Sequence, residues 1–207
     1  GFFDSGIGGV SLLPAAEALL PFESICYIAD HAYSPYGEKP LDVVLNRARV
    51  ITEKLLQFNC KLIVLACNTA TTQIIDQLRA EFPVSFVGIE PAIKPAALAT
   101  KTGKVGVLAT KGTLESELFH QSVTEHGSGI DIVPQIGKGL VACVEGGKRE
   151  DQATKELLKS HLAPMIDKGI DTLVLGCTHY PFLINTIEQI LPTGVTIIDN
   201  SQAIANQ

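Results

Sequence analysis

The chain has 207 residues, of which 46% are hydrophobic and 18% are charged. This composition supports a sizeable core and excludes a disordered chain. Sixteen Lys plus Arg residues stand against 22 Asp plus Glu residues, which gives a net charge of −6. Without a basic cluster we expect no nucleic-acid partner. No apolar run approaches the ~18 residues of a membrane span, so we expect no membrane partner.

Short β-branched runs alternate with segments in which apolar residues recur every three or four positions. This alternation is typical of βα units with parallel strands. The expected strands cover residues 24–28, 62–65, 84–87, 105–108, 172–175 and 195–198, and the expected helices cover residues 41–58, 114–125, 151–167 and 181–191. The sequence therefore predicts an α/β fold.

A weak internal repeat divides the chain into two similar halves. The strand and polar loop around Asp4 match those around Thr110, and the segment around Cys67 matches that around Cys177. We expect two pseudosymmetric α/β domains, each a mostly parallel sheet flanked by helices, with the active site in the cleft between them. The first comprises residues 1–92 plus 200–207, and the second comprises residues 93–199. Since Gly1 already ends a strand pattern, we expect a piece of a longer protein.

The cysteines carry the strongest chemical signal. Five are present, an odd number without close pairs, so we expect free thiols in a reducing cytoplasm. Cys67 and Cys177 each follow a strand and precede a helix, where ligands bind in parallel α/β sheets. A helix N-terminus also lowers the pKa of a thiol. We interpret Cys26, Cys60 and Cys143 as structural thiols.

Two weak acid/base groups on opposite faces of one carbon are the requirement for stereoinversion. One thiol removes the proton from Cα, and the other delivers a proton to the opposite face. Donors around the carboxylate stabilise the intermediate. The sequence shows no signature for pyridoxal phosphate, so we expect cofactor-independent chemistry.

Polar residues beside the cysteines are candidates for binding an amino acid. Asp4 and Ser5 open a glycine-rich loop and suit a cationic amino group, whereas Asn68, Thr69 and Thr178 suit a carboxylate. The loop at residues 34–40 is a candidate cover for the cleft. We expect His31, His120, His126 and His161 to be solvated and without a role.

Three other functions use the same residues. Cys177 and His179 offer two ligands to zinc, but structural zinc sites use four protein ligands. A cysteine hydrolase would use Cys67 or Cys177 as the nucleophile, with His179 as its base. A noncatalytic amino-acid binder would use the same cleft without needing two thiols.

Six motifs resemble those of the glutamate racemase family, within the aspartate/glutamate racemase superfamily. They are Phe3-Asp4-Ser5-Gly6-Ile7-Gly8-Gly9, Tyr36-Gly37-Glu38-Lys39, Ala66-Cys67-Asn68-Thr69-Ala70, Gly88-Ile89-Glu90-Pro91-Ala92, Ala109-Thr110-Lys111-Gly112-Thr113 and Gly176-Cys177-Thr178-His179-Tyr180-Pro181. The resemblance implies cofactor-independent interconversion of L- and D-glutamate, which supplies D-glutamate for peptidoglycan and hence for the cell wall and cell shape.

The resemblance also implies roles for individual residues. Cys67 resembles the acid/base that acts on D-glutamate, and Cys177 resembles the one that acts on L-glutamate. Asp4 and His179 resemble the groups that assist the two thiols. The substrate-binding pairs are similar to Asp4 and Ser5, Tyr36 and Gly37, Asn68 and Thr69, and Thr178 and His179. Asp30 and Glu145 resemble nearby acidic positions to which we assign no role. The sequence does not determine the oligomeric state, and a homo-oligomer is one of the states that it leaves open.

Overall fold

The computed structural model describes residues 1–199. The expected return of residues 200–207 to the first domain therefore lies outside the described residues. Within residues 1–199, no helix is both long and apolar enough to cross a membrane.

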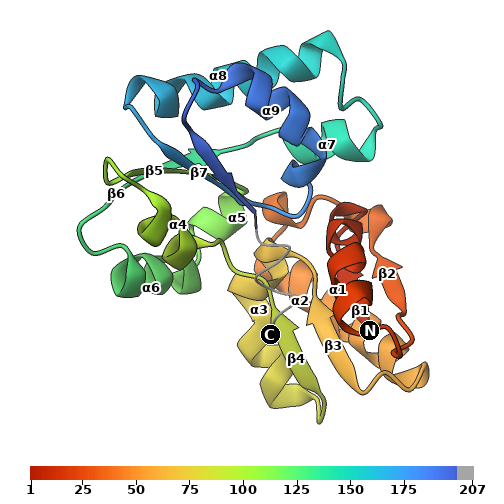
Figure 1. The fold of residues 1–207 in the computed structure, drawn as a ribbon. Helices are drawn as coiled ribbons and strands as arrows, with labels where there is room; N and C mark the ends of the chain where they lie inside the picture. The colour runs from red at the N-terminus through yellow and green to blue at the C-terminus, as the bar shows by residue number, and fades with distance from the viewer. Residues whose placement is uncertain (200–207) are drawn as a thin grey trace.

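The strands form two parallel sheets with the same topology, as Figure 1 shows. The first sheet has the order β2-β1-β3-β4 and the second has the order β6-β5-β7-β8. The strands are β1 (Phe2–Asp4), β2 (Tyr27–Ala29), β3 (Leu62–Leu65), β4 (Ser85–Gly88), β5 (Lys104–Ala109), β6 (Asp131–Ile136), β7 (Thr172–Gly176) and β8 (Thr196–Ile198). The predicted α/β class and the internal repeat are confirmed, because β1, β3 and β4 correspond in order to β5, β7 and β8.

Helices connect consecutive strands, as parallel pairing requires. The α-helices are α1 (Leu13–Leu19), α2 (Leu41–Gln57), α3 (Asn68–Glu81), α4 (Ile93–Ala99), α5 (Lys111–Leu114), α6 (Glu117–His126), α7 (Leu140–Glu145), α8 (Gln152–Asp167) and α9 (Ile184–Ile190). The 3-10 segments are η1 (Gly8–Leu12), η2 (His31–Tyr33), η3 (Tyr36–Glu38) and η4 (Tyr180–Leu183). The long predicted helices at residues 41–58 and 151–167 match α2 and α8 closely.

Both sheets are covered on their two faces. In the first, one face packs against α2 and α3 through Val44, Leu55 and Ile74, while Leu12 and Ala16 pack on the other. In the second, α7, α8 and α9 cover one face, and α4 and α6 cover the other. Sheets that are buried on both faces explain why their strands read as continuous apolar runs.

The edge strand β6 was not predicted from the sequence. It contains Pro134, which cannot donate a hydrogen bond to a neighbouring strand. β6 is an edge strand that pairs only with β5, so there is no strand on its other side that would need the N–H that Pro134 lacks.

The two halves meet through the segments that follow the carboxyl ends of their strands. η1 contacts η4, and both α3 and η3 contact α5. The loops that follow the strands of the two halves therefore face one another across this contact. Because α4 packs against β7 and β8, we propose that the first domain ends near residue 92.

Leu162 on α8 tests the packing of the second half. It is fully buried in the cluster beneath β5 and β7, so Leu162→Ala should lower the free energy of unfolding by about 2–5 kcal/mol. Leu98 on α4 is the matched control, because 81% of it is exposed. Urea denaturation should show a change within about 0.5 kcal/mol for Leu98→Ala. Equal losses for the two variants would contradict the assigned packing.

Candidate active site

Cys67 stands between β3 and α3, at the first position before the helix. Its side chain is buried, with 5% exposed. The backbone N–H groups of Ala70 and Ser5 both donate to its sulfur. The thiol is thus fixed by one donor from its own helix and one from the loop after β1.

The environment of Cys67 differs from the expected one. Burial raises the pKa of the Cys67 thiol, and the neighbouring Asp4 charge raises it further. The N–H groups of Ala70 and Ser5 lower the pKa but only in part. The Ala70 N–H at the helix N-terminus does lower this pKa, but the expected net lowering is wrong because desolvation outweighs it. Cys67 is therefore held as the protonated thiol.

Asp4 ends β1 and is fully buried at the contact between the halves. Its Oδ1 accepts from the Ser5 hydroxyl at 3.0 Å and the Gly6 N–H at 3.1 Å, and its Oδ2 accepts from the Thr178 hydroxyl at 2.7 Å. Burial raises the pKa of Asp4, while the charge of His179 and these three donors oppose the rise. Asp4 therefore connects both halves through one carboxylate.

Cys177 follows β7 and is also buried. Its sulfur lies 3.8 Å from Nδ1 of His179. Burial lowers the pKa of His179, but its hydrogen bonds with Cys177 and Glu145 outweigh burial and raise the pKa to about 10. The imidazole is thus a cation at neutral pH, and it lies beside the Cys177 sulfur. The two cysteines consequently have opposite electrostatic surroundings.

Glu145, at the end of α7, bridges the two halves. Its Oε1 accepts from Nε2 of His179 and from the Ile7 N–H, the latter at 2.8 Å. Its Oε2 lies 2.9 Å from Nδ1 of His31. Burial alone would raise the pKa of Glu145, but the contacts with His179, Ile7 and His31 lower it overall. His31 is exposed, as expected, and its imidazole also contacts this half-buried carboxylate.

A further group of hydroxyl and amide side chains lies at the N-terminal ends of α3 and α5. Thr69 Oγ1 lies 2.8 Å from Thr110 Oγ1, and Thr110 Oγ1 lies 3.0 Å from Thr113 Oγ1. A Cβ on Gly37 would stand 2.7 Å from the Thr110 Cβ, so this position requires glycine. Asn68 is buried, and its Oδ1 has no hydrogen-bond partner. Thr110 and Thr113 were not predicted as site residues, although they lie in one of the recognised motifs.

Tyr36 is placed differently from the other candidate binding residues. Its hydroxyl donates to Asp30 at 2.7 Å, and Arg47 donates to the same carboxylate at 3.0 and 2.8 Å. Asp30 is buried at 6% exposure. The phenol of Tyr36 is therefore engaged within the first half, and Asp30 anchors this loop.

The cavity beside Cys177 is small. A cavity of about 10 Å³, lined by Asn68, Cys177 and Thr178 among others, has room for about one water molecule. Burial, the Asp4 charge and, to a smaller extent, the charge of Cys177 raise the pKa of Cys67. The structure therefore brings together Cys67, Cys177, Asp4, Ser5, Asn68, Thr69, Thr178 and His179 in a closed arrangement.

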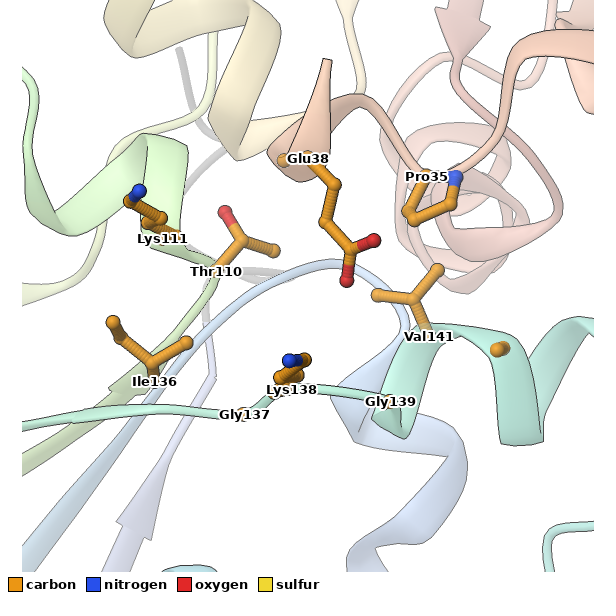
Figure 2. A pocket seen from close by; sticks show the side chains of 11 residues that line it. Pro35, Glu38, Thr110, Lys111, Ile136, Gly137, Lys138, Gly139 and Val141 are labelled. Atoms are coloured by element: carbon orange, nitrogen blue, oxygen red, sulfur yellow. The ribbon is translucent and has the colours of Figure 1, made fainter.

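A larger cavity of about 440 Å³ lies beside this closed site. Figure 2 shows Glu38 pointing into it from the first half, above the loop of Gly137, Lys138 and Gly139. Gly37 and Thr110, which contact one another at the edge of the site, also line it. Its volume falls within the range of small-molecule sites.

The described part of the chain, residues 1–199, holds no group of three or more His, Cys, Asp or Glu side chains arranged to bind a metal ion. All five cysteines are free thiols.

The chain is similar to known proteins over its whole length. The Asp/Glu/Hydantoin racemase family model matches residues 13–207. The glutamate racemase of Ectopseudomonas mendocina is 47% identical over 208 aligned positions, which cover 100% of this chain and 79% of that protein.

Solved structures agree with this similarity. A glutamate racemase isoform from Bacillus anthracis superposes with a TM-score of 0.90 at 34% identity, covering 100% of this chain and 78% of that one. The Escherichia coli glutamate racemase, solved with L-glutamate and the activator UDP-MurNAc-ala, also gives a TM-score of 0.90, at 36% identity. That match covers 99% of this chain and 78% of the other.

Gly8 tests whether the close contact between the halves is needed. A Cβ at this position would overlap the imidazole of His179 and the hydroxyl of Thr178. We expect Gly8→Ala to displace these groups and to lower kcat for the enzyme's reaction about 100-fold, the effect of a misplacement of about 1 Å. Val10→Ala is the control, because Val10 lies on the same 3-10 segment and its side chain is exposed. Unchanged kcat in Gly8→Ala would refute the contact.

Proposed function

We propose that this chain interconverts L- and D-glutamate through Cys67 and Cys177. The chain belongs to the Asp/Glu/Hydantoin racemase family and to its glutamate racemases, and is thus an amino-acid racemase. The observation that carries this proposal is the pair of buried thiols at matched strand ends, one from each half. Family membership does not favour the cysteine hydrolase or the noncatalytic binder.

The chemistry follows from the two environments. In the direction from L-glutamate, Cys177, which lies beside His179, is the base that removes the Cα proton. The protonated Cys67 delivers its own proton to the opposite face. The reverse direction exchanges the two roles. Each turnover breaks one C–H bond and one S–H bond and forms one of each.

The carbanionic intermediate needs donors around its carboxylate. Asn68, Thr69 and Thr178 lie beside the sulfurs, and the hydroxyls of Thr110 and Thr113 extend this set. Such preorganised donors act where negative charge develops. Asp4 and the Ser5 hydroxyl suit the ammonium group of the substrate. We infer that no cofactor takes part, since these groups supply every proton transfer.

Substrate entry requires the halves to separate. Cys177 and Thr178 line a cavity of only about 10 Å³, so glutamate does not fit beside Cys177 in the closed arrangement. The contacts that must open are those of Asp4 with Thr178 and of Glu145 with Ile7 and His31. Closure around the substrate then excludes water from the carbanion.

The wider role follows from the product. D-Glutamate made by this reaction would serve peptidoglycan synthesis, and with it the cell wall and cell shape. A cytoplasmic location agrees with the five free cysteines.

Replacing either cysteine by serine tests the two-base assignment. An alcohol is nearly isosteric with a thiol but is a far poorer acid/base at neutral pH. We expect Cys67→Ser and Cys177→Ser each to lower kcat by about 10²–10⁴-fold, the typical contribution of general acid–base catalysis. Chiral chromatography of L-glutamate reactions measures the rate, and calorimetry should show that binding persists. Cys143→Ser, a half-buried thiol outside the site, is the control. Normal turnover in either active-site variant would refute the assignment.

Isotope incorporation tests the mechanism independently of any variant. In D₂O the protonating thiol carries a solvent-derived deuteron, so product formed early should be deuterated at Cα. The remaining substrate should stay protiated, because the thiol that took its proton returns the same proton if the carbanion collapses. Mass spectrometry of the separated enantiomers measures both. Substantial unlabelled product at early conversion would mean that a single base serves both faces.

A further inference from the structure

The cavity of about 440 Å³ beside the closed site is lined by residues of both halves. Gly37 and Glu38 reach it from η3 of the first half, and Thr110, Lys111 and Lys138 reach it from the second. Thr110 and Lys111 follow β5, and Lys138 follows β6. The cavity therefore lies at the carboxyl ends of these strands, where ligands bind in parallel α/β sheets.

Three charged side chains line this cavity. Figure 2 shows Glu38 pointing into it, with Lys111 and Lys138 among the other lining side chains. Within residues 1–199, neither Glu38 nor Lys138 takes part in an ion pair. Lys111 Nζ lies 3.8 Å from Glu115 Oε1, and such exposed pairs are weak. All three charges are therefore available to a ligand.

The charges define the chemistry of that ligand. Two lysines and one glutamate give the cavity a formal charge of 2 − 1 = +1. At neutral pH free glutamate carries two carboxylates and one ammonium group, and so a charge of −1. Its groups complement those of the cavity in number and in sign. The volume also falls in the range of small-molecule sites.

The cavity adjoins the cysteines through one contact between the halves. A Cβ on Gly37 would stand 2.7 Å from the Thr110 Cβ, so the η3 backbone lies directly against this threonine. Thr110 Oγ1 lies 2.8 Å from Thr69 Oγ1, and Thr69 is two residues beyond Cys67. Separation of the halves parts Gly37 from Thr110 and connects the cavity with the cysteine site.

Substrate entry creates a need for such an outer site. The chain has a net charge of −6, so its overall field repels anionic glutamate. A molecule that arrives from solution must also meet the halves while they are open. A molecule already held beside Gly37 and Thr110 can enter at every opening. A local positive region raises the substrate concentration at that point.

We propose that this cavity is an outer binding site for glutamate, in which Lys111 and Lys138 attract the two carboxylates and Glu38 attracts the ammonium group before the halves open. This inference rests on the proposed glutamate racemisation. The site binds both enantiomers, since charge pairing of this kind does not depend on which face of Cα is presented. It serves substrate entry and product release alike.

Kinetics distinguish this role from damage to the cysteine site. Occupancy of an outer site changes kcat/KM, but kcat at saturating substrate stays the same. Weaker outer binding also does not make cleavage of the Cα–H bond more rate-limiting. Damage to the cysteine site instead lowers kcat and raises the isotope effect of Cα-deuterated glutamate on kcat/KM.

The main test uses Lys138→Glu and the double variant Lys111→Gln/Lys138→Gln. Both lysines are exposed, so the fold should tolerate these changes. We expect each variant to lower kcat/KM about tenfold in both directions, with unchanged kcat and no rise in the isotope effect. Added salt should lower kcat/KM of the unmodified enzyme more than that of the double variant. Lys159→Glu, an equal change of charge at an exposed position of α8, is the control and should leave kcat/KM unchanged.

Glu38→Gln separates an amino-acid site from general attraction of anions. Loss of this carboxylate should lower kcat/KM if it binds the ammonium group, but should raise kcat/KM if the cavity only attracts negative charge. An increase or no change in this variant would overturn the proposal. So would an unchanged kcat/KM in the lysine variants, an equal loss in Lys159→Glu, or a lower kcat with a larger isotope effect. None of these outcomes would touch the proposed function, because racemisation and deuterium incorporation by the unmodified enzyme test that separately.

Discussion

The Asp4 carboxylate lies fully buried where the two halves meet, and a charge in such a place is tolerated only when donors surround it. Two donors, from Ser5 and Gly6, belong to its own loop, but the third comes from Thr178 in the other half. The carboxylate is therefore fully satisfied only when the halves are closed. Closure and the electrostatics of the site are thus set by the same interaction. Burial raises the pKa of Cys67, and the Asp4 charge raises it further because it opposes the formation of a second anion nearby.

Much of the fold could be predicted from the sequence because parallel strands buried on both faces leave a strong apolar signal. The run at residues 62–65 matches β3 to the residue, and the repeat correctly related Cys67 to Cys177. β6 was missed because Pro134 interrupts its pattern, and only its edge position makes that proline tolerable. The cysteines of the site could be found because strand ends in a parallel sheet are defined by local sequence.

The rest of the site depends on contacts between distant segments. Nothing in the sequence around His31 or Glu145 indicates that they meet, because their contact exists only when the two halves close. The pKa of Cys67 could not be predicted either. Its helix position favours a lower pKa, but the opposing desolvation depends on how completely the second half covers it. The contact between His31 and Glu145 and the pKa of Cys67 both depend on tertiary contacts, which the local sequence does not reveal.

The duplicated topology also explains how the two thiols come to differ. The position that ends β1 is Asp4, and the position after β5 in the second half is Thr110. Two residues beyond the cysteine, the first half has Thr69 and the second has His179. Each half thus supplies one ionisable partner, an acid from the first and a base from the second, on an otherwise equivalent framework.

This asymmetry has a thermodynamic limit in a racemase. The two enantiomers have equal free energies in solution, so the equilibrium constant is one whatever the enzyme does. The ratio of kcat/KM for the two directions must therefore also be one, because both directions cross the same transition state from reactants of equal free energy. Unequal surroundings of Cys67 and Cys177 can alter kcat and KM separately, by changing how tightly each enantiomer binds. The acidic and basic partners consequently determine which protonation state of the free enzyme waits for substrate, and not which enantiomer is favoured.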